Sequence, residues 1–180
     1  MEIVYNGSCE GHPPCPTNPM ERSMDDQFPP RTHEPLDLDE IWDLSDALAD
    51  RLEEGGDEVT FALLEEVARA QDSDLTHLYV AAGLDPDTVW KREYPVAFVV
   101  CTGSCQAWGS IEALEGLITE RSSRVSAGRP AFDIVTTACL DVCLPSPPYA
   151  VSLGPEGKAV HPGVTRQQVM EAVATRVDGE

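Results

Sequence analysis

Between residues 36 and 93 the apolar positions recur at steps of three and four, which is the spacing of one face of a helix. A first helix is expected to begin near Leu38 and to stop at Gly55-Gly56. A second is expected over 59–71, and a short third over 73–83. Residues of the first two expected to face inward are Leu38, Ile41, Leu44, Leu48, Leu52, Phe61, Leu64, Val67 and Ala68.

The pattern changes at residue 94, where short apolar runs rich in β-branched residues alternate with longer periodic stretches. The elements expected in this part, in chain order, are a strand over 95–101, a helix over 106–121, a strand over 131–137, a hairpin of strands over 148–153 and 157–161, and a helix beginning near Thr165. Gln168 follows Thr165 at the spacing of a capping box. This order predicts an α/β domain over 94–180, with helices packed against a sheet.

The first 35 residues differ from both of these parts. They contain seven of the 15 prolines and little apolar periodicity, so an extended, Pro-rich tail is expected. The predicted organisation is therefore a tail over 1–35, an acidic helical region over 36–93 and the α/β domain over 94–180. The start of the chain lacks the basic and apolar regions of a secretory signal, and a cytoplasmic location is expected.

Charge narrows the classes of partner. The net charge is −20, from 32 acidic and 12 basic residues, so the chain is expected to bind neither nucleic acid nor a membrane. Residues 36–90 hold 16 acidic and two basic residues, which would steer a partner with a basic docking patch. Adaptation to a salt-rich cytoplasm is an equally good explanation of this composition. No stretch of apolar residues is long enough to span a membrane.

Four cysteines form two pairs with three residues between the members of each pair. Cys101 and Cys105 follow the first expected strand, and Cys139 and Cys143 follow the second. Thiolate pairs on loops at the ends of neighbouring strands can converge on one metal centre. Clustered thiols in a reducing compartment favour metal binding or redox work over structural disulfides. The cysteines therefore indicate a metal centre, and an electron carrier is the favoured interpretation.

The surrounding sequence resembles a known family. The segment Cys101-Thr-Gly-Ser-Cys105-Gln-Ala-Trp-Gly109 before an amphipathic helix, and Ala138-Cys139-Leu-Asp-Val-Cys143 before Pro147-Pro148 and a strand, are similar to the thioredoxin-like [2Fe–2S] ferredoxins. Among these, the small iron–sulfur subunits of NADH dehydrogenase and of NAD-linked hydrogenases and formate dehydrogenases are the nearest in organisation. Those subunits usually have four residues between the first two cysteines, where this chain has three.

The resemblance implies a thioredoxin-like fold and one [2Fe–2S] cluster held by Cys101, Cys105, Cys139 and Cys143. It also implies an electron-transfer protein that is a subunit or dedicated partner of a larger oxidoreductase, without catalysis of its own. Gly103 is expected to let the backbone approach closely at the cluster, and Asp141 would add negative charge beside it.

Other interpretations of the same residues remain open. The four thiolates would also suit zinc, and a redox disulfide or a site that binds nothing would leave a thioredoxin-like adaptor or assembly protein. Cys9 and Cys15 flank His12 in the tail and are more often incidental than ligands of a second metal. The chain shows neither a phosphate-binding glycine loop nor a Ser/His/Asp arrangement, so enzymatic activity is not expected.

Overall fold

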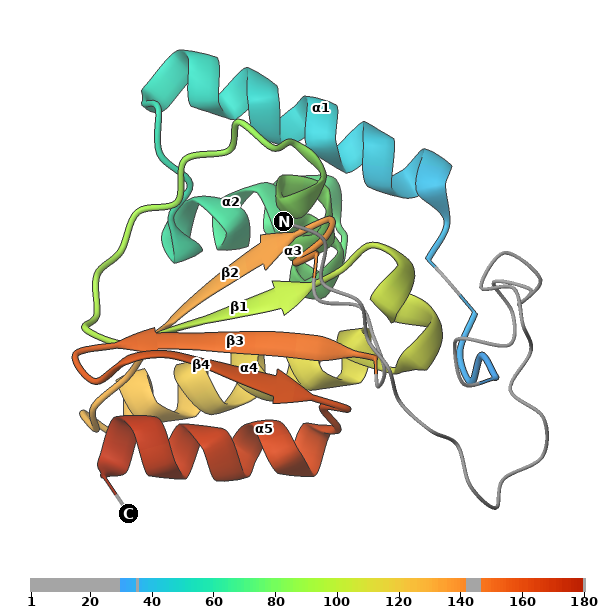
Figure 1. Cartoon of the computed structure of the whole chain (residues 1–180). Helices are drawn as coiled ribbons and strands as arrows, with labels where there is room; N and C mark the ends of the chain where they lie inside the picture. The colour runs from blue at the N-terminus through green and yellow to red at the C-terminus, as the bar shows by residue number, and fades with distance from the viewer. Residues whose placement is uncertain (1–29, 35, 142–146, 180) are drawn as a thin grey trace, which may run out of the picture.

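The computed structural model describes residues 30–34, 36–141 and 147–179. The predicted tail over 1–35 therefore lies largely outside the described residues, and 30–34 are exposed and form neither helix nor strand. None of the described helices is long and apolar enough to cross a membrane. The chain has an α/β fold, with helices on either side of a four-stranded mixed sheet (Figure 1).

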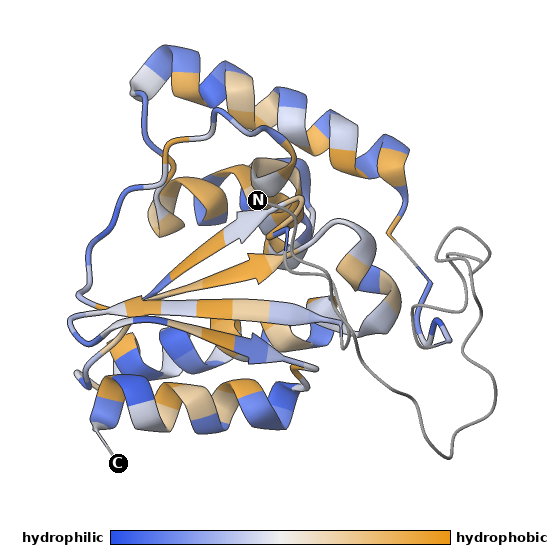
Figure 2. Ribbon diagram, viewed as in Figure 1, coloured by the Kyte–Doolittle hydropathy of each residue, from blue (hydrophilic) through white to orange (hydrophobic). Residues whose placement is uncertain are grey.

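The three expected helices before the sheet are present as α1 (Leu38–Gly55), α2 (Phe61–Gln71) and α3 (Leu75–Leu84). Each begins at a capping residue, Asp37, Thr60 and Asp74 respectively, whose side-chain oxygen accepts a backbone N–H from the first turn of the helix. The helix α3 has almost no polar face, and seven of its residues are buried, because it packs between α1 and the sheet. Apolar residues of these helices turn toward the interior in Figure 2.

The sheet has the strand order β2-β1-β3-β4. The strands are β1 (Ala97–Cys101), β2 (Asp133–Thr137), β3 (Tyr149–Gly154) and β4 (Gly157–Pro162). Strand β1 is parallel to β2 and antiparallel to β3, and β3 is antiparallel to β4, so the predicted hairpin is confirmed. A cis peptide bond joins Pro147 to Pro148 directly before β3.

Two helices follow β1 and β4. The helix α4 (Ser110–Ser126) connects β1 to β2, and α5 (Arg166–Val173) follows β4; the two pack against each other. The predicted capping box of Thr165 and Gln168 begins α5. The helix expected over 106–121 begins later than predicted. A short 3₁₀ helix, η3 (Ser104–Trp108), precedes it, and Gly109 with φ 95° separates the two because only glycine enters this conformation readily.

One continuous core joins the helical region to the sheet, with apolar residues from α1, α2, α3, strands β1 to β3, α4 and α5. Arg121 of α4 is 5% exposed and lies at this junction. Its guanidinium lies 3.8 Å from the Phe61 ring centroid, and its Nε donates to the Phe132 carbonyl at 3.1 Å. Burial of this charge is tolerated because it is hydrogen-bonded, stacked on an aromatic face and paired with Glu93.

Candidate metal centre

The two cysteine loops begin at the carboxyl ends of adjacent parallel strands. Cys101 is the last residue of β1 and pairs in register with Thr137, the last residue of β2. The pairing continues past the strands, because the Thr102 N–H donates to the Thr137 carbonyl at 2.9 Å. Cys139 therefore follows β2 by two residues, directly beside the loop that carries Cys101 and Cys105.

Beyond the strands the two loops touch backbone to backbone. A Cβ atom placed on Gly103 would overlap the carbonyl of Ala138, so this position accepts only glycine without movement of a loop. The Cys101 Sγ lies 3.6 Å from the Ala138 carbonyl oxygen. Gly103 thus allows a close backbone approach to the loop before Cys139, whereas its expected approach to a cluster stays a prediction.

The sulfur of Cys101 is the best-defined part of the site. Cys101 and Cys105 are both 2% exposed, and a hydrogen bond from the Cys105 thiol is the main influence that lowers the pKa of Cys101 to about 6. Burial acts in the opposite direction, while backbone N–H groups of Leu140, Gly103 and Cys105 donate to the same sulfur and lower its pKa further. Donors from both loops therefore favour the thiolate, which is the form that binds metal.

The second loop supplies Cys139, which is exposed. The Asp141 N–H lies 3.3 Å from its sulfur, and Asp141 itself adopts a left-handed conformation with φ 54°. This turn aims a backbone donor at Cys139, as N–H groups are aimed at Cys101 in the first loop. The fourth predicted ligand, Cys143, lies outside the described residues, as do Cys9, His12 and Cys15.

Within the described ranges, no three His, Cys, Asp or Glu side chains are grouped closely enough to hold a metal ion. The structure does bring Cys101 and Cys105 together, and it places the loop before Cys139 against them. The donor set fits a thiophilic metal centre on two observations, the burial of the thiol pair and the backbone donors that stabilise negative charge on sulfur.

Sequence reasoning did not anticipate the role of Gln106, the residue after Cys105. Its buried side chain donates from Nε2 to the Thr102 carbonyl at 2.5 Å and accepts the Leu36 N–H on Oε1 at 2.9 Å. The amide thus ties η3 to the end of β1 and to the start of α1. A glutamine beside a cysteine was the available signal, but one of its two partners, Leu36, lies 70 residues away in sequence and carries no motif.

The segment before α1 also lies across η3. The N–H groups of Thr32 and His33 both donate to the Ala107 carbonyl, at 2.8 and 3.2 Å. His33 Nε2 lies 2.7 Å from Glu112 Oε1 at the start of α4. Thr32, His33 and Leu36 therefore form a strap that fixes the loop carrying Cys105 from its outer side.

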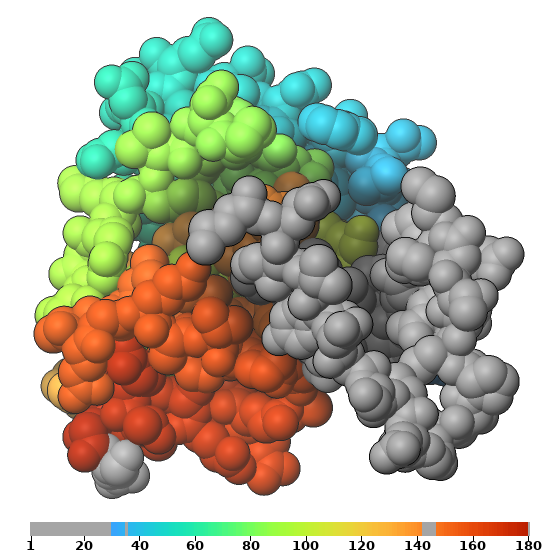
Figure 3. Space-filling model, in the orientation of Figure 1, coloured from blue at the N-terminus to red at the C-terminus, as the bar shows by residue number. Residues whose placement is uncertain are grey.

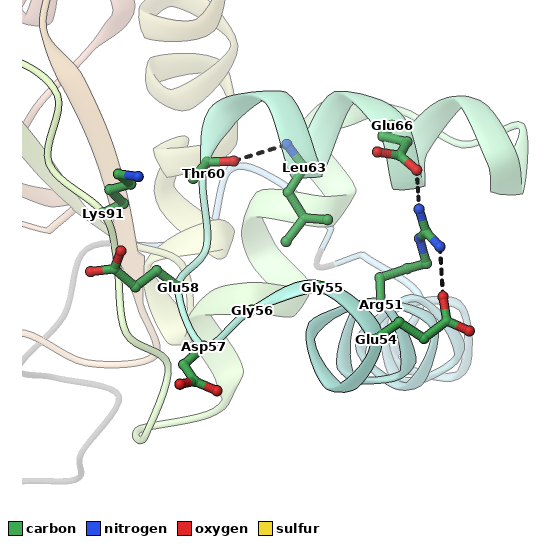
Figure 4. Close-up of a pocket in the computed structure, with 10 residues that line it drawn as sticks. All are labelled: Arg51, Glu54, Gly55, Gly56, Asp57, Glu58, Thr60, Leu63, Glu66 and Lys91. Carbon is green, nitrogen blue, oxygen red and sulfur yellow. Dashed lines mark hydrogen bonds and ion pairs between the residues drawn. The ribbon is translucent and has the colours of Figure 1, made fainter.

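A separate hollow of about 500 Å³ lies between the end of α1, the start of α2 and Lys91 (Figure 4). Arg51 reaches between Glu54 and Glu66 and pairs with both, and Thr60 caps α2 at its rim. This hollow is at the opposite end of α1 from the strap, about 27 Å away along a helix of 18 residues. Its charged residues are paired with each other or exposed, and it contributes nothing to the cysteine site.

Comparison with known proteins adds no relative to this description. No protein-family model matches the chain, and the search of curated proteins gives no match.

Proposed function

We propose that this chain is an electron-transfer protein that carries one [2Fe–2S] cluster on Cys101, Cys105, Cys139 and Cys143. The observation that carries the proposal is the contact between the two cysteine loops, in which Gly103 lies against the Ala138 backbone and the Cys101 Sγ lies 3.6 Å from the Ala138 carbonyl oxygen. Each iron of such a cluster takes two thiolates, and each loop offers two. When bound, the cluster accepts and releases one electron at a time.

The arrangement of the sheet supports a thioredoxin-like fold for the cluster-binding part. The strand order is β2-β1-β3-β4, with β3 antiparallel to the other three strands, and a helix connects the parallel pair. A thioredoxin-like fold would be consistent with this strand order. It places the ends of β1 and β2, and thus both cysteine loops, at one end of the sheet.

The chain's own residues would set the properties of the centre. Burial of Cys101 and Cys105 excludes water from one side, and the backbone donors from Leu140, Gly103 and Asp141 withdraw electron density from sulfur. Donors of this kind favour the reduced state and raise the reduction potential. The chain would act without catalysis of its own, as a subunit or partner of a larger oxidoreductase whose docking surface is basic, because this chain carries a net charge of −20.

A dithiol–disulfide carrier is the second candidate, because Cys101 and Cys105 are already in hydrogen-bond contact. In that role the two thiols would join in a disulfide, releasing two protons and passing two electrons to an oxidised dithiol partner. Cys139 would then be dispensable. The two candidates differ in metal content and in the number of electrons transferred.

The test is anaerobic purification or reconstitution of the full chain, followed by assay of iron and acid-labile sulfide and by EPR of the dithionite-reduced protein. The electron-transfer proposal predicts about two irons and two sulfides per chain and a rhombic S = 1/2 signal on reduction. Tightly bound zinc with no iron uptake would instead indicate a zinc-stabilised adaptor. A metal-free chain with a reversible Cys101–Cys105 disulfide would support the dithiol candidate.

A further inference from the structure

An apolar pair stands exposed at the start of α1. Leu38, which was expected to face inward, is instead 58% exposed, and Trp42 is 56% exposed; these are the two highest values among the large apolar side chains of the described residues. They are four residues apart and therefore adjacent on one helix flank. The inward face of α1 is made by Ile41, Leu44 and Leu48, so neither Leu38 nor Trp42 is needed to anchor the helix to the core.

Acidic residues border this pair along the outer side of the helix. Asp39, Asp43, Asp46, Asp50 and Glu53 follow one another at steps of three and four, and all are exposed. Figure 3 shows α1 forming the upper outer surface of the molecule. An indole flanked by carboxylates is suited to a guanidinium or ammonium group, which the ring face and the carboxylates both attract.

The pair also lies at the cysteine end of the molecule. The Leu36 N–H donates to Gln106, the residue next to Cys105, at 2.9 Å, and α1 begins two residues later. Trp42 follows Leu38 by about 6 Å along the helix axis. The strap and the Gln106 bridge thus hold the start of α1 in a fixed position beside the loop that carries the buried thiol pair.

We infer that Leu38, Trp42 and the flanking Asp39, Asp43 and Asp46 form a docking surface for a basic protein. The partner's surface would present Lys or Arg side chains around a shallow apolar site that receives Trp42. A second copy of this chain is a poor occupant, because two acidic stripes would face each other, and an anionic membrane is repelled for the same reason. The docking surface itself does not depend on the proposed function. Only one part of the inference rests on it, namely that the partner exchanges electrons with the nearby centre.

The binding test uses the full chain with ¹⁵N-labelled tryptophan and ferrocytochrome c as a basic heme-protein probe. The indole N–H signals of the chain are followed by NMR during titration at low and at high salt. The docking surface predicts a saturable, salt-sensitive shift of the Trp42 signal. Trp42→Ala should weaken binding about tenfold, as expected for a central aromatic anchor, and Asp43→Asn about two- to fivefold. Trp42→Phe should bind with intermediate affinity.

Two matched variants control for general effects of removing an apolar group or a charge. Val125→Ala alters a side chain that is 47% exposed at the far end of α4, and Glu115→Gln removes an exposed charge from the same helix. Both should leave the affinity unchanged. The inference is overturned if Trp42→Ala binds as well as Val125→Ala, or if the Trp42 signal stays in place at saturation. Self-association that Trp42→Ala abolishes would make a second copy the occupant instead.

The outcome is separable from that of the proposed function, because the titration needs no cluster. Where the chain carries a cluster, the rate of electron transfer to ferricytochrome c should fall in Trp42→Ala while the iron content is retained. A chain without iron that still binds through Trp42 would remove the electron-transfer proposal and keep the docking surface. A cluster-bearing chain whose binding and electron-transfer rate are unchanged by Trp42→Ala would keep the electron-transfer proposal and remove the docking surface.

Discussion

Substitution of Gly103 by alanine tests the contact between the two cysteine loops. The added Cβ would overlap the Ala138 backbone carbonyl, which cannot rotate away as a side chain would. The loops would have to separate by roughly an ångström to reach ordinary contact distance. That movement weakens the Thr102 N–H bond to the Thr137 carbonyl, 2.9 Å in the structure, and the contact of the Leu140 N–H with Cys101.

The expected cost combines two opposing effects. Forcing an extra methyl group into a packed site costs about 1–3 kcal/mol, while replacing glycine with alanine recovers about 0.4–1 kcal/mol from the unfolded chain. The net loss in the free energy of unfolding should be about 1–2 kcal/mol. For a chain of 180 residues that corresponds to a fall in Tm of roughly 2–8 °C. Urea denaturation of the metal-free protein measures the loss directly.

Gly55→Ala is the matched control, because a Cβ on this last residue of α1 would meet nothing within 4 Å. It should be neutral or stabilising by up to about 1 kcal/mol. Iron uptake during reconstitution should fall in Gly103→Ala and stay unchanged in Gly55→Ala. Equal stability and equal iron content of the two variants would show that the loops do not meet at Gly103, and the reasoning about the site would then be wrong.

Two further predictions concern the supports of the site and of the fold. Gln106→Leu leaves the Thr102 carbonyl and the Leu36 N–H without their partner. The free energy of unfolding measured in urea should therefore be about 2 kcal/mol lower than in the wild type. An unchanged urea midpoint would contradict the bridge. Asp178→Asn should cost about 1 kcal/mol at pH 7, because Arg124 binds this carboxylate at 2.6 and 2.7 Å and holds the pKa of Asp178 below its usual value. A lowered carboxyl pKa gives stability that is present above about pH 4 and is lost as the pH falls through the lowered value. The difference in Tm between the wild type and Asp178→Asn should therefore shrink in acid. A constant difference in Tm from pH 7 to pH 3 would refute the assignment.

The elements of the fold were largely predictable from local pattern. The glycine pair that ends α1, the capping box of α5 and the hairpin of β3 and β4 all rest on short-range signals, and each is present. The start of α4 was misplaced because Ser104–Trp108 has a helical composition yet forms a 3₁₀ turn. Only Gly109, in a left-handed conformation, separates η3 from α4. A glycine inside a periodic stretch does not by itself predict that conformation.

The site was predictable to the extent that it depends on spacing. The placement of the cysteine pairs after neighbouring strands follows from the sequence, because each pair lies close to the end of its own strand. The partners of these residues do not. The Ala138 carbonyl, the Leu140 N–H and the Gln106 bridge to Leu36 arise from segments that meet only in the folded chain, through backbone atoms common to every residue. Arg121 was missed similarly, since a buried guanidinium in α4 requires partners from three other segments.

The central claim is that one centre is built from both cysteine loops. The most direct measurement is the iron content and EPR spectrum of single Cys→Ser variants, one from each loop, reconstituted in parallel with a tail variant. Cys101→Ser and Cys139→Ser should each abolish the cluster or change its EPR signal, whereas Cys9→Ser should match the wild type. Full iron content and an unchanged spectrum in Cys139→Ser would contradict the claim, because the second loop would then hold no part of the centre.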